Sequence, residues 1–562
     1  MRQKCFSVIV ACALTLGSIP NAFGDSQKAS DNGSKAKGND KMGHVLLISI
    51  DGMHALDFQN CSAMGLCPNM EALAKRGTTF TRASTSKPSD SFPGLMNIVT
   101  GATPKTHGAF YDVAYDRILA PPSADTGNGL IHGNCIKNQY NGTRTEFEEG
   151  VDIDQSKLNG GDPNVGPYDG GIGAIDPTKL PRDPFNNCAP VYPWNFIRTN
   201  TIYGVIHAAG GYTAWSDKHA VYAVVSGPSN NASNVDDYFA PEVNSDVVPL
   251  PGVLTATGWS CANIRDNNGG DWTTSFQNIQ CYDTLKVNAI LNQIDGKTHD
   301  GKHSAPVPNV FGMNFQSVSV GQKLIESGVK GGYIDAAGTP TTAMADELTF
   351  VDASIGAMVN ELKKQGLLDK TTIIITAKHG QSPIDTNRFF PIPGSAGTNG
   401  MPPSAVIASY LPASETTDPI GSTEDDISLL WLNHSSDTLA AVQKLEAAGA
   451  TAGIGQIFYG PSITTMHNSP MFDSRTPDII VQPNVGVVYT GSKKKQAEHG
   501  GFAQDDVNVM LLVSRPDMQA KTITTAVETT QVAPTILTIL GLDPSKLDGV
   551  QKEGTQALPG LN

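Results

Sequence analysis

The sequence predicts an α/β protein with a mostly parallel central sheet and helices on both faces. Two apolar runs of strand length, His44–Ile50 and Thr371–Ala377, are typical of buried parallel strands, and the second is almost wholly β-branched. Ahead of the second run, Ala343–Gln365 has apolar residues at the spacing of a long amphipathic helix. Buried strands that are separated by helices favour a parallel sheet covered on both sides.

The remaining elements follow from shorter patterns. Thr213–Val225 is strand-like at both ends. Further strands are expected at 78–83, 308–314, 478–481 and 509–513, and helices at 68–76, 201–209, 283–294, 437–448 and 531–540.

Length and composition suggest how these elements are divided among domains. The chain has 562 residues, with 57 glycines and 36 prolines, so long loops are expected around an ample core. The predicted parts are a signal peptide (1–24), a disordered linker (25–42), a main domain (43–545) and a C-terminal tail (546–562). Within the main domain we expect a loop-rich insertion at 118–200 and a small α/β cap at 387–473.

The first 24 residues have the three parts of a secretory signal. Arg2 and Lys4 are basic, Phe6–Ile19 is apolar, and Ala22–Gly24 suits cleavage. Lipidation at Cys12 is the weaker alternative, because the apolar run continues well beyond it. We therefore expect a secreted or periplasmic protein without a membrane anchor.

Charge and cysteine content agree with an exported protein. The formal net charge is −15, which disfavours sequence-independent binding of nucleic acid. Six of the eight cysteines follow the signal, an even number that suggests disulfides. Pairing of nearest neighbours is expected, although other connectivities stay open: Cys61–Cys67, Cys135–Cys188 and Cys261–Cys281.

Ser86–Gly101 is the stretch that points most directly to chemistry. Pro93 suits the first turn of a helix, which places Ser91 at the helix N-terminus. Free N–H groups there favour an anion, so the Ser91 hydroxyl can act as a nucleophile or simply cap the helix. Asp51 follows the first strand directly, at the edge of a parallel sheet where functional side chains gather.

These motifs resemble the alkaline phosphatase superfamily, and in particular its type I phosphodiesterase/nucleotide pyrophosphatase branch. The likeness lies in SIDGM, SFPGLMNIVTGATPKTHG, TIIITAKHG (372–380), EHGGF (498–502) and TQVAPTILTILGL (530–542). The resemblance implies an alkaline phosphatase-like fold, hydrolysis of phosphodiester or pyrophosphate bonds, and Ser91 as the nucleophile. It also implies divalent metal ions, with zinc the expected metal.

The implied ligand set is incomplete in this sequence. Asp51, Ser91 and His379 match the first metal site, but Lys378 replaces its second Asp. The second site keeps only His499, because Val318 and Gln322 stand where the family has Asp and His. One metal ion is therefore expected rather than two. In the alternative, no ion binds, Lys378 supplies the positive charge in its place, and His379 or His499 is the general acid or base.

The substrate contacts differ from the family as well. Gly94 stands where the family has an Asn, and Asn97 is a candidate replacement. Lys218 and His219 resemble the Lys and His that contact the substrate in sulfatases and phosphonate hydrolases. Gln322 is a further candidate for substrate contact. His107 is expected to be a structural hydrogen-bonding residue.

The expected function is an exported hydrolase of a small phosphate ester. The alternatives are a sulfate or phosphonate ester hydrolase on the same fold and a non-catalytic binding member of the superfamily. No nucleic-acid partner is expected, and the sequence does not indicate an oligomeric state.

Overall fold

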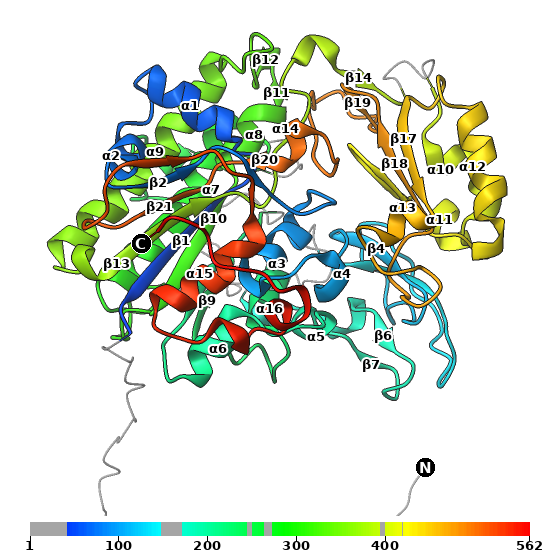
Figure 1. The fold of residues 1–562 in the computed structure, drawn as a ribbon, viewed down its shortest axis with the longest axis horizontal. Coiled ribbons are helices and arrows are strands. Elements are labelled where there is room, and N and C mark those ends of the chain that lie inside the picture. The colour runs from blue at the N-terminus through cyan, green and yellow to red at the C-terminus, as the bar shows by residue number, and fades with distance from the viewer. Residues whose placement is uncertain are drawn as a thin grey trace, which may run out of the picture. The chain divides into compact units, whose positions relative to one another are not determined.

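The structure is a computed structural model that describes residues 42–147, 171–243, 250–263, 272–393, 400–418 and 420–561 (Figure 1). The chain divides into residues 1–35 and 36–562, and all described residues belong to the second unit. The predicted signal peptide and all but the last residue of the predicted linker therefore lie outside the described residues.

An eight-stranded sheet forms the centre of the second unit. Its strands, in sheet order, are β22 (Lys521–Ile523), β2 (Gly77–Phe80), β21 (Leu512–Ser514), β13 (Thr371–Thr376), β1 (His44–Ile50), β10 (Val310–Phe315), β8 (Ala214–Ser216) and β9 (Asp237–Phe239). β21 is antiparallel to both of its neighbours, whereas the other adjacent pairs in this sheet are parallel. The predicted fold class is confirmed.

β1 lies between β10 and β13 and is buried along almost its whole length. The register pairs Ile50 with Phe315 and Ser49 with Thr376. Because the three strands are parallel, their carboxyl ends meet at one edge of the sheet. The residues that follow them in the chain therefore come together there.

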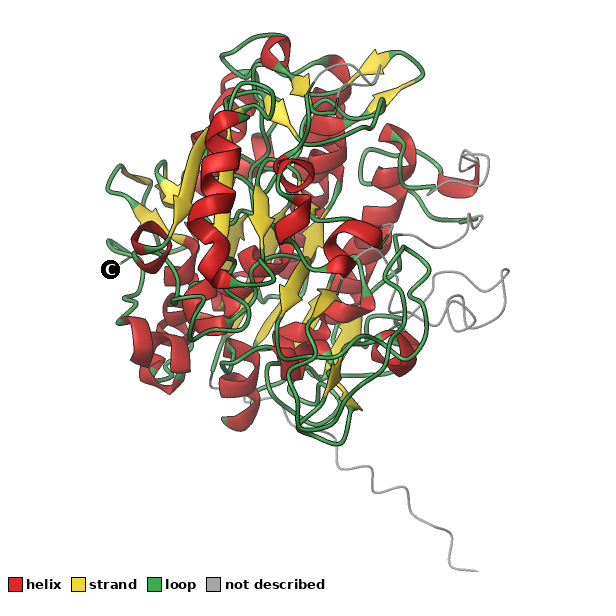
Figure 2. Cartoon of the chain, turned by 90° about the vertical axis from the view of Figure 1, so that its right-hand side faces the viewer, coloured by secondary structure: helices red, strands yellow, loops and turns green. Residues whose placement is uncertain are grey.

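Helices pack on both sides of this sheet (Figure 2). One mutually contacting group consists of α2 (Pro68–Ala74), α7 (Phe276–Ile294), α8 (Ser317–Lys323) and α9 (Thr342–Lys364). A second group consists of α3 (Ser91–Thr100), α6 (Ile202–Ala208), α15 (Val532–Ile539) and the 3₁₀ helix η4 (Ala220–Ser226). The inner face predicted for α9, including Leu348, Val351 and Ile355, is buried.

A smaller antiparallel sheet has its own apolar core. It consists of β15 (Thr423–Glu424), β16 (Ser428–Leu430), β18 (Ile479–Pro483) and β17 (Ile454–Tyr459), with α12 (Thr438–Ala447) packed nearby. The strand expected at 478–481 is part of this smaller sheet, where Ile479 pairs with Leu430 and Tyr459. A short apolar run predicts burial without indicating which strand it will pair with.

One other expectation is corrected, and the C-terminal residues can be described further. The apolar run 220–225 is part of η4 rather than a strand, and its residues are all buried, so its composition reflects burial. The predicted tail contains α16 (Asp548–Glu553), whose Glu553 Oε1 accepts a hydrogen bond from Thr103 N at 3.0 Å. These residues therefore pack against the main domain.

The expected disulfides are confirmed as Cys61–Cys67, Cys135–Cys188 and Cys261–Cys281. The second joins parts of the insertion, which contains β5 (Thr143–Glu146), β6 (Arg182–Asp183), β7 (Ala189–Pro190) and α5 (Pro193–Phe196). Other short elements are α1 (Ala55–Ala63), β3 (Ala83–Ser84), α4 (Pro104–His107), β4 (Val113–Asp116), β11 (Ile325–Glu326), β12 (Val329–Lys330), β14 (Phe390–Pro391), α10 (Pro403–Val406), α11 (Ala413–Thr417), α13 (Pro461–Thr464), β19 (Val487–Val488), α14 (Gln504–Val507), β20 (Asn508–Val509) and β23 (Val527–Glu528).

None of the helices within the described ranges is both long enough and apolar enough to cross a membrane.

Candidate active site

Ser91 is the first residue of α3 and is fully buried. Asp90 caps the helix, with its carboxylate accepting a hydrogen bond from Phe92 N, and Pro93 occupies the first turn as predicted. The helix therefore begins in a fixed orientation, with its N-terminal N–H groups beside the Ser91 hydroxyl.

Asp51 and His379 lie against that hydroxyl. Ser91 Oγ is 3.3 Å from Asp51 Oδ2 and 3.1 Å from His379 Nε2. Asp51 follows β1 and His379 lies three residues beyond the end of β13, so the parallel strand ends deliver both groups. The spatial convergence expected from the sequence is present.

The tautomer of His379 follows from its second contact. Its Nδ1 is 2.8 Å from the carbonyl oxygen of Gly380, an acceptor, so Nδ1 carries the hydrogen in the neutral ring. Nε2 then presents a lone pair to Ser91 Oγ. This arrangement suits removal of the hydroxyl proton by His379.

Two lysines bring positive charge to the same place. Lys218 Nζ lies 3.2 Å from Ser91 Oγ. Lys378 is fully buried, with Nζ 2.9 Å from Asp217 Oδ1 and 4.0 Å from Asp51 Oδ2. It also lies 4.0 Å from the centre of the Tyr222 ring, a favourable cation–π contact.

Asp51 is held as an anion. Burial by itself would raise the pKa of its carboxyl, but Lys378, then His379 and Lys218, lower the pKa well below the usual value. Asn314 Nδ2 and Gln316 Nε2 also donate to Asp51 Oδ2, at 3.1 and 2.7 Å. The site therefore carries a fixed negative charge between two ammonium groups.

His499 stacks beside His379, with ring centres 4.0 Å apart. Its Nδ1 lies 3.5 Å from Asp90 Oδ1. Burial, together with His379, lowers the pKa of His499 well below its ordinary value. Both effects favour the neutral form of the His499 ring.

These residues do not fit the family's two-ion centre. Within the described ranges, no group of three His, Cys, Asp or Glu side chains could hold a metal ion. Val318 cannot ligate one, and an ammonium group beside Asp51 opposes a divalent cation at close range. One feature favours a single ion: Asp51 Oδ1 is buried with no hydrogen-bond partner among the described residues.

Two other residues predicted to contact substrate, His219 and Gln322, have different surroundings. His219 lines a cavity beside Lys218, and its Nδ1 is 2.6 Å from Glu242 Oε1. Gln322 Nε2 instead donates to the Gly52 carbonyl oxygen at 2.7 Å and to Tyr333 Oη at 2.8 Å. Gln322 therefore supports the buried chain behind Asp51 rather than presenting its amide to a substrate.

The substrate contact expected of Asn97 is not supported. Its amide is buried and lies 3.0 Å from His107 Nε2 and within reach of the carbonyl oxygens of Pro93 and Ala102. His107 also accepts a hydrogen bond from Ala109 N, and burial lowers its pKa to about 3. Both residues join the exit of α3 to the next loop, as expected for His107.

Sequence reasoning did not single out Asp217, Tyr222, Asn314 or Gln316. Gln316 directly follows the strand that ends at Phe315, and Asp217 directly follows β8, so strand-end position was an available signal. Tyr222 lies in the run that was interpreted as a strand, and its contact with Lys378 depends on η4.

Gly94 explains how α3 approaches the end of β13. A Cβ at this position would lie 2.1 Å from the carbonyl oxygen of Lys378. The first turn of the helix is thus in close contact with the peptide that carries Lys378 and leads to His379. The glycine that replaces the family's Asn permits this approach.

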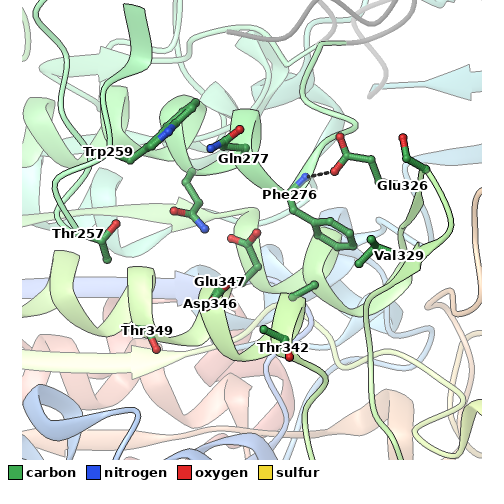
Figure 3. Close-up of a pocket in the computed structure, with 13 residues that line it drawn as sticks. Thr257, Trp259, Phe276, Gln277, Glu326, Val329, Thr342, Asp346, Glu347 and Thr349 are labelled. Carbon is green, nitrogen blue, oxygen red and sulfur yellow. Dashed lines mark hydrogen bonds between the residues drawn. The ribbon is translucent and has the colours of Figure 1, made fainter. Parts of the chain in front are cut away.

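A larger cavity of about 640 Å³ lies elsewhere, between α7, α9 and the β11–β12 turn (Figure 3). Trp259, Phe276, Glu326 and Asp346 line it, and Glu347 points from α9 toward α7. Glu347 is fully buried, and this burial, with Asp283 nearby, raises the pKa of its carboxyl well above the usual value.

Comparison with known proteins gives one family. A sequence model described as type I phosphodiesterase / nucleotide pyrophosphatase matches residues 45–145 and 319–505, together about half of the chain. Curated protein sequences give no match.

Among solved structures, murine ectonucleotide pyrophosphatase/phosphodiesterase 5 has a TM-score of 0.52 and 14% sequence identity, with 89% of this chain and 96% of that chain covered. The same murine protein, described as inactive and in complex with AMP, gives a TM-score of 0.51, with the same identity and coverage. At this identity the likeness shows the fold.

Replacing Gly94 with Ala is expected to destabilise the protein, because the added methyl group clashes with the Lys378 carbonyl. We expect a loss of about 1–3 kcal/mol, measured by calorimetry as a lower unfolding temperature. Gly173→Ala is the matched control, since a Cβ there meets nothing within 4 Å. Equal unfolding temperatures for the two variants would contradict this account of the contact.

Replacing Glu347 with Gln is expected to stabilise the protein at pH 8 more than at pH 5. The pKa of the Glu347 carboxyl is higher in the folded protein than its usual value of 4.5. The buried carboxyl therefore contributes its full stability below pH 4.5, and this stability is lost as the pH rises toward the folded pKa. Calorimetry at the two pH values measures the change, which we expect to be at least about 1 kcal/mol. Asp346→Asn, at an exposed neighbouring position, should show a smaller trend of the same sign, because the Asp346 charge contributes less than burial to the raised pKa of Glu347.

Proposed function

The chain belongs to the type I phosphodiesterase/nucleotide pyrophosphatase family and is a hydrolase of that type, and on this premise we propose that it acts through a covalent intermediate on Ser91. One observation carries the proposal: Ser91 Oγ lies 3.1 Å from His379 Nε2 and 3.2 Å from Lys218 Nζ. A hydroxyl beside both a base and a cation is an activated nucleophile.

In the first step, His379 takes the Ser91 proton while Oγ forms a bond to phosphorus. The bond between phosphorus and the leaving oxygen breaks, and that oxygen departs with the electron pair. In the second step, water attacks the phosphorus of the Ser91 ester, and the bond between phosphorus and Oγ breaks with its electron pair staying on Oγ. His379 then returns its proton to Ser91 Oγ, and the proton released by the water neutralises the departed group.

The two ammonium groups supply the positive charge in this scheme. Charge grows on the phosphoryl oxygens during transfer, and fixed cations in a buried site stabilise it without reorganising. Lys218 contacts the nucleophile directly, and Lys378 is held in place by Asp217. When bound, a divalent ion would supply the same stabilisation, and Asp51, Ser91 and His379 are its candidate ligands, with His499 nearby.

Two further parts of the proposal concern substrate and location. The AMP complex of the structurally similar murine protein supports a nucleotide-type phosphate ester as the substrate. Three disulfides and the signal-like first 24 residues support export to an oxidising compartment. The second candidate function, hydrolysis of sulfate or phosphonate esters, is favoured by the lysines that contact Ser91 and Asp51.

Ser91→Ala is expected to lower turnover of bis(p-nitrophenyl) phosphate by at least about 10³-fold, because no covalent intermediate can form. Release of p-nitrophenol measures the rate. A parallel panel of aryl sulfate and aryl phosphonate esters separates the two candidate functions. Unchanged turnover in the variant would exclude Ser91 as nucleophile, and no turnover of any ester by the unmodified protein would leave the non-catalytic alternative.

Lys218→Met is expected to lower kcat by about 10²–10³-fold, since it removes a cation that contacts the nucleophile.

Dialysis of the unmodified protein against EDTA should change kcat by less than about twofold if the lysines supply the charge. Loss of activity on dialysis, with recovery on adding Zn²⁺, would instead favour the one-ion arrangement. For the Lys218→Met measurement, thermal unfolding checks that the variant is folded.

A further inference from the structure

The cavity of about 640 Å³ between α7, α9 and the β11–β12 turn has no part in the proposed reaction. The described residues that line it include none of the candidate active-site residues. A space of this volume is large enough for a small organic molecule. The side chains around it indicate the chemistry of such a molecule.

The charged side chains of the cavity lining are acidic. Among the described residues they are Glu326 from β11 and Asp346 and Glu347 from α9, with no Lys, Arg or His. Glu326 Oε2 accepts a hydrogen bond from Phe276 N at 3.1 Å, which orients that carboxylate (Figure 3). Acidic groups that surround one cavity attract a cation.

Glu347 lacks hydrogen-bond partners in this cavity. It is fully buried, and neither of its carboxyl oxygens has a hydrogen bond of ordinary geometry among the described residues. Figure 3 shows the side chain directed from α9 toward α7. A buried carboxyl without such a bond costs free energy, so a ligand that brings N–H donors to it is favoured.

Two aromatic rings make an organic cation a better fit than a metal ion. Trp259 and Phe276 both line the cavity, and Figure 3 shows them on different segments that face the same space. Aromatic faces attract organic ammonium groups and bury apolar carbon. Within the described ranges, no group of three His, Cys, Asp or Glu side chains could hold a metal ion.

From this lining we propose that the cavity binds a protonated organic amine with an apolar body. The ammonium group donates to Glu347, and the apolar body packs against Trp259 and Phe276. Gln280 also lines the cavity and acts on the Glu347 carboxyl, so its amide turns aside when the ammonium group takes that place. The inference does not depend on the proposed hydrolysis.

Binding in this way requires Glu347 to lose its proton. Burial, and after it Asp283 from α7, raises the pKa of the carboxyl well above the usual value. Asp346 and Glu326 raise the pKa as well, whereas Gln280 lowers it. An ammonium group beside the carboxyl favours its charged form, so the proton passes to the solvent when the amine binds.

Titration calorimetry at pH 7 with 2-phenylethylamine, which is protonated there, tests the site. The unmodified protein should bind this amine at least about 10-fold more tightly than 2-phenylethanol, a neutral molecule of similar size, because only the amine pairs with Glu347. Glu347→Gln should remove this preference. Glu361→Gln is the matched control, since it makes the same change near the end of α9, outside the described cavity lining.

Proton release gives a second readout. Titrations in HEPES and in Tris, which differ in ionisation enthalpy, should show that the unmodified protein releases a proton on binding the amine and that Glu347→Gln does not. Ser91→Ala should bind the amine as the unmodified protein does, because the cavity is separate from the candidate active site. Calorimetric unfolding confirms that each variant is folded.

The outcomes decide the inference whether or not the protein hydrolyses a phosphate ester. Equal affinity for the amine and the alcohol in the unmodified protein, or an unchanged preference in Glu347→Gln, would overturn it. Loss of amine binding in Ser91→Ala would also overturn it, because the amine would then occupy the active site. A preference that is lost in Glu347→Gln and kept in Glu361→Gln and Ser91→Ala supports it.

Discussion

The buried ammonium group of Lys378 is the constraint on which the candidate site depends. Removing such a charge from water costs several kcal/mol unless it is paired. Here the Asp217 carboxylate at 2.9 Å, the Tyr222 ring and the Asp51 carboxylate surround it. Asp217 and Asp51 directly follow β8 and β1, and Tyr222 lies in η4. The pairing of one side chain therefore fixes the relative positions of three segments that are distant in the sequence.

The sequence was sufficient to predict the class of fold and the buried strands at the centre of the main sheet. Buried parallel strands have continuous apolar runs, which made β1 and β13 recognisable, and the residues that follow them must meet at one edge. Asp51, Ser91 and His379 were grouped by the resemblance to the family together with the strand-end positions of Asp51 and His379, and the structure has Asp51 and His379 within hydrogen-bond range of Ser91. Pairing of neighbouring cysteines was one of several connectivities that the sequence left open, and it is the one that the structure has.

What could not be predicted depends on tertiary contacts. Asn97 and Gln322 have side chains that would suit a substrate, but the structure uses their amides to join α3 to its exit loop and to support Gly52. β18 has the composition of a main-sheet strand and pairs elsewhere, since strand partners are not encoded in a five-residue run. The sequence also did not indicate that Asp217 would be the partner of Lys378.

The position of β1 in the sheet has a consequence for biosynthesis. Val45 pairs with Val310, and His44 pairs with Thr371, so neither neighbour of the first strand exists until most of the chain has been made. Until then, an apolar strand with two unsatisfied edges remains available to other chains. A polypeptide interrupted before residue 371 should be prone to aggregation, and a holding chaperone would be of most use during this interval.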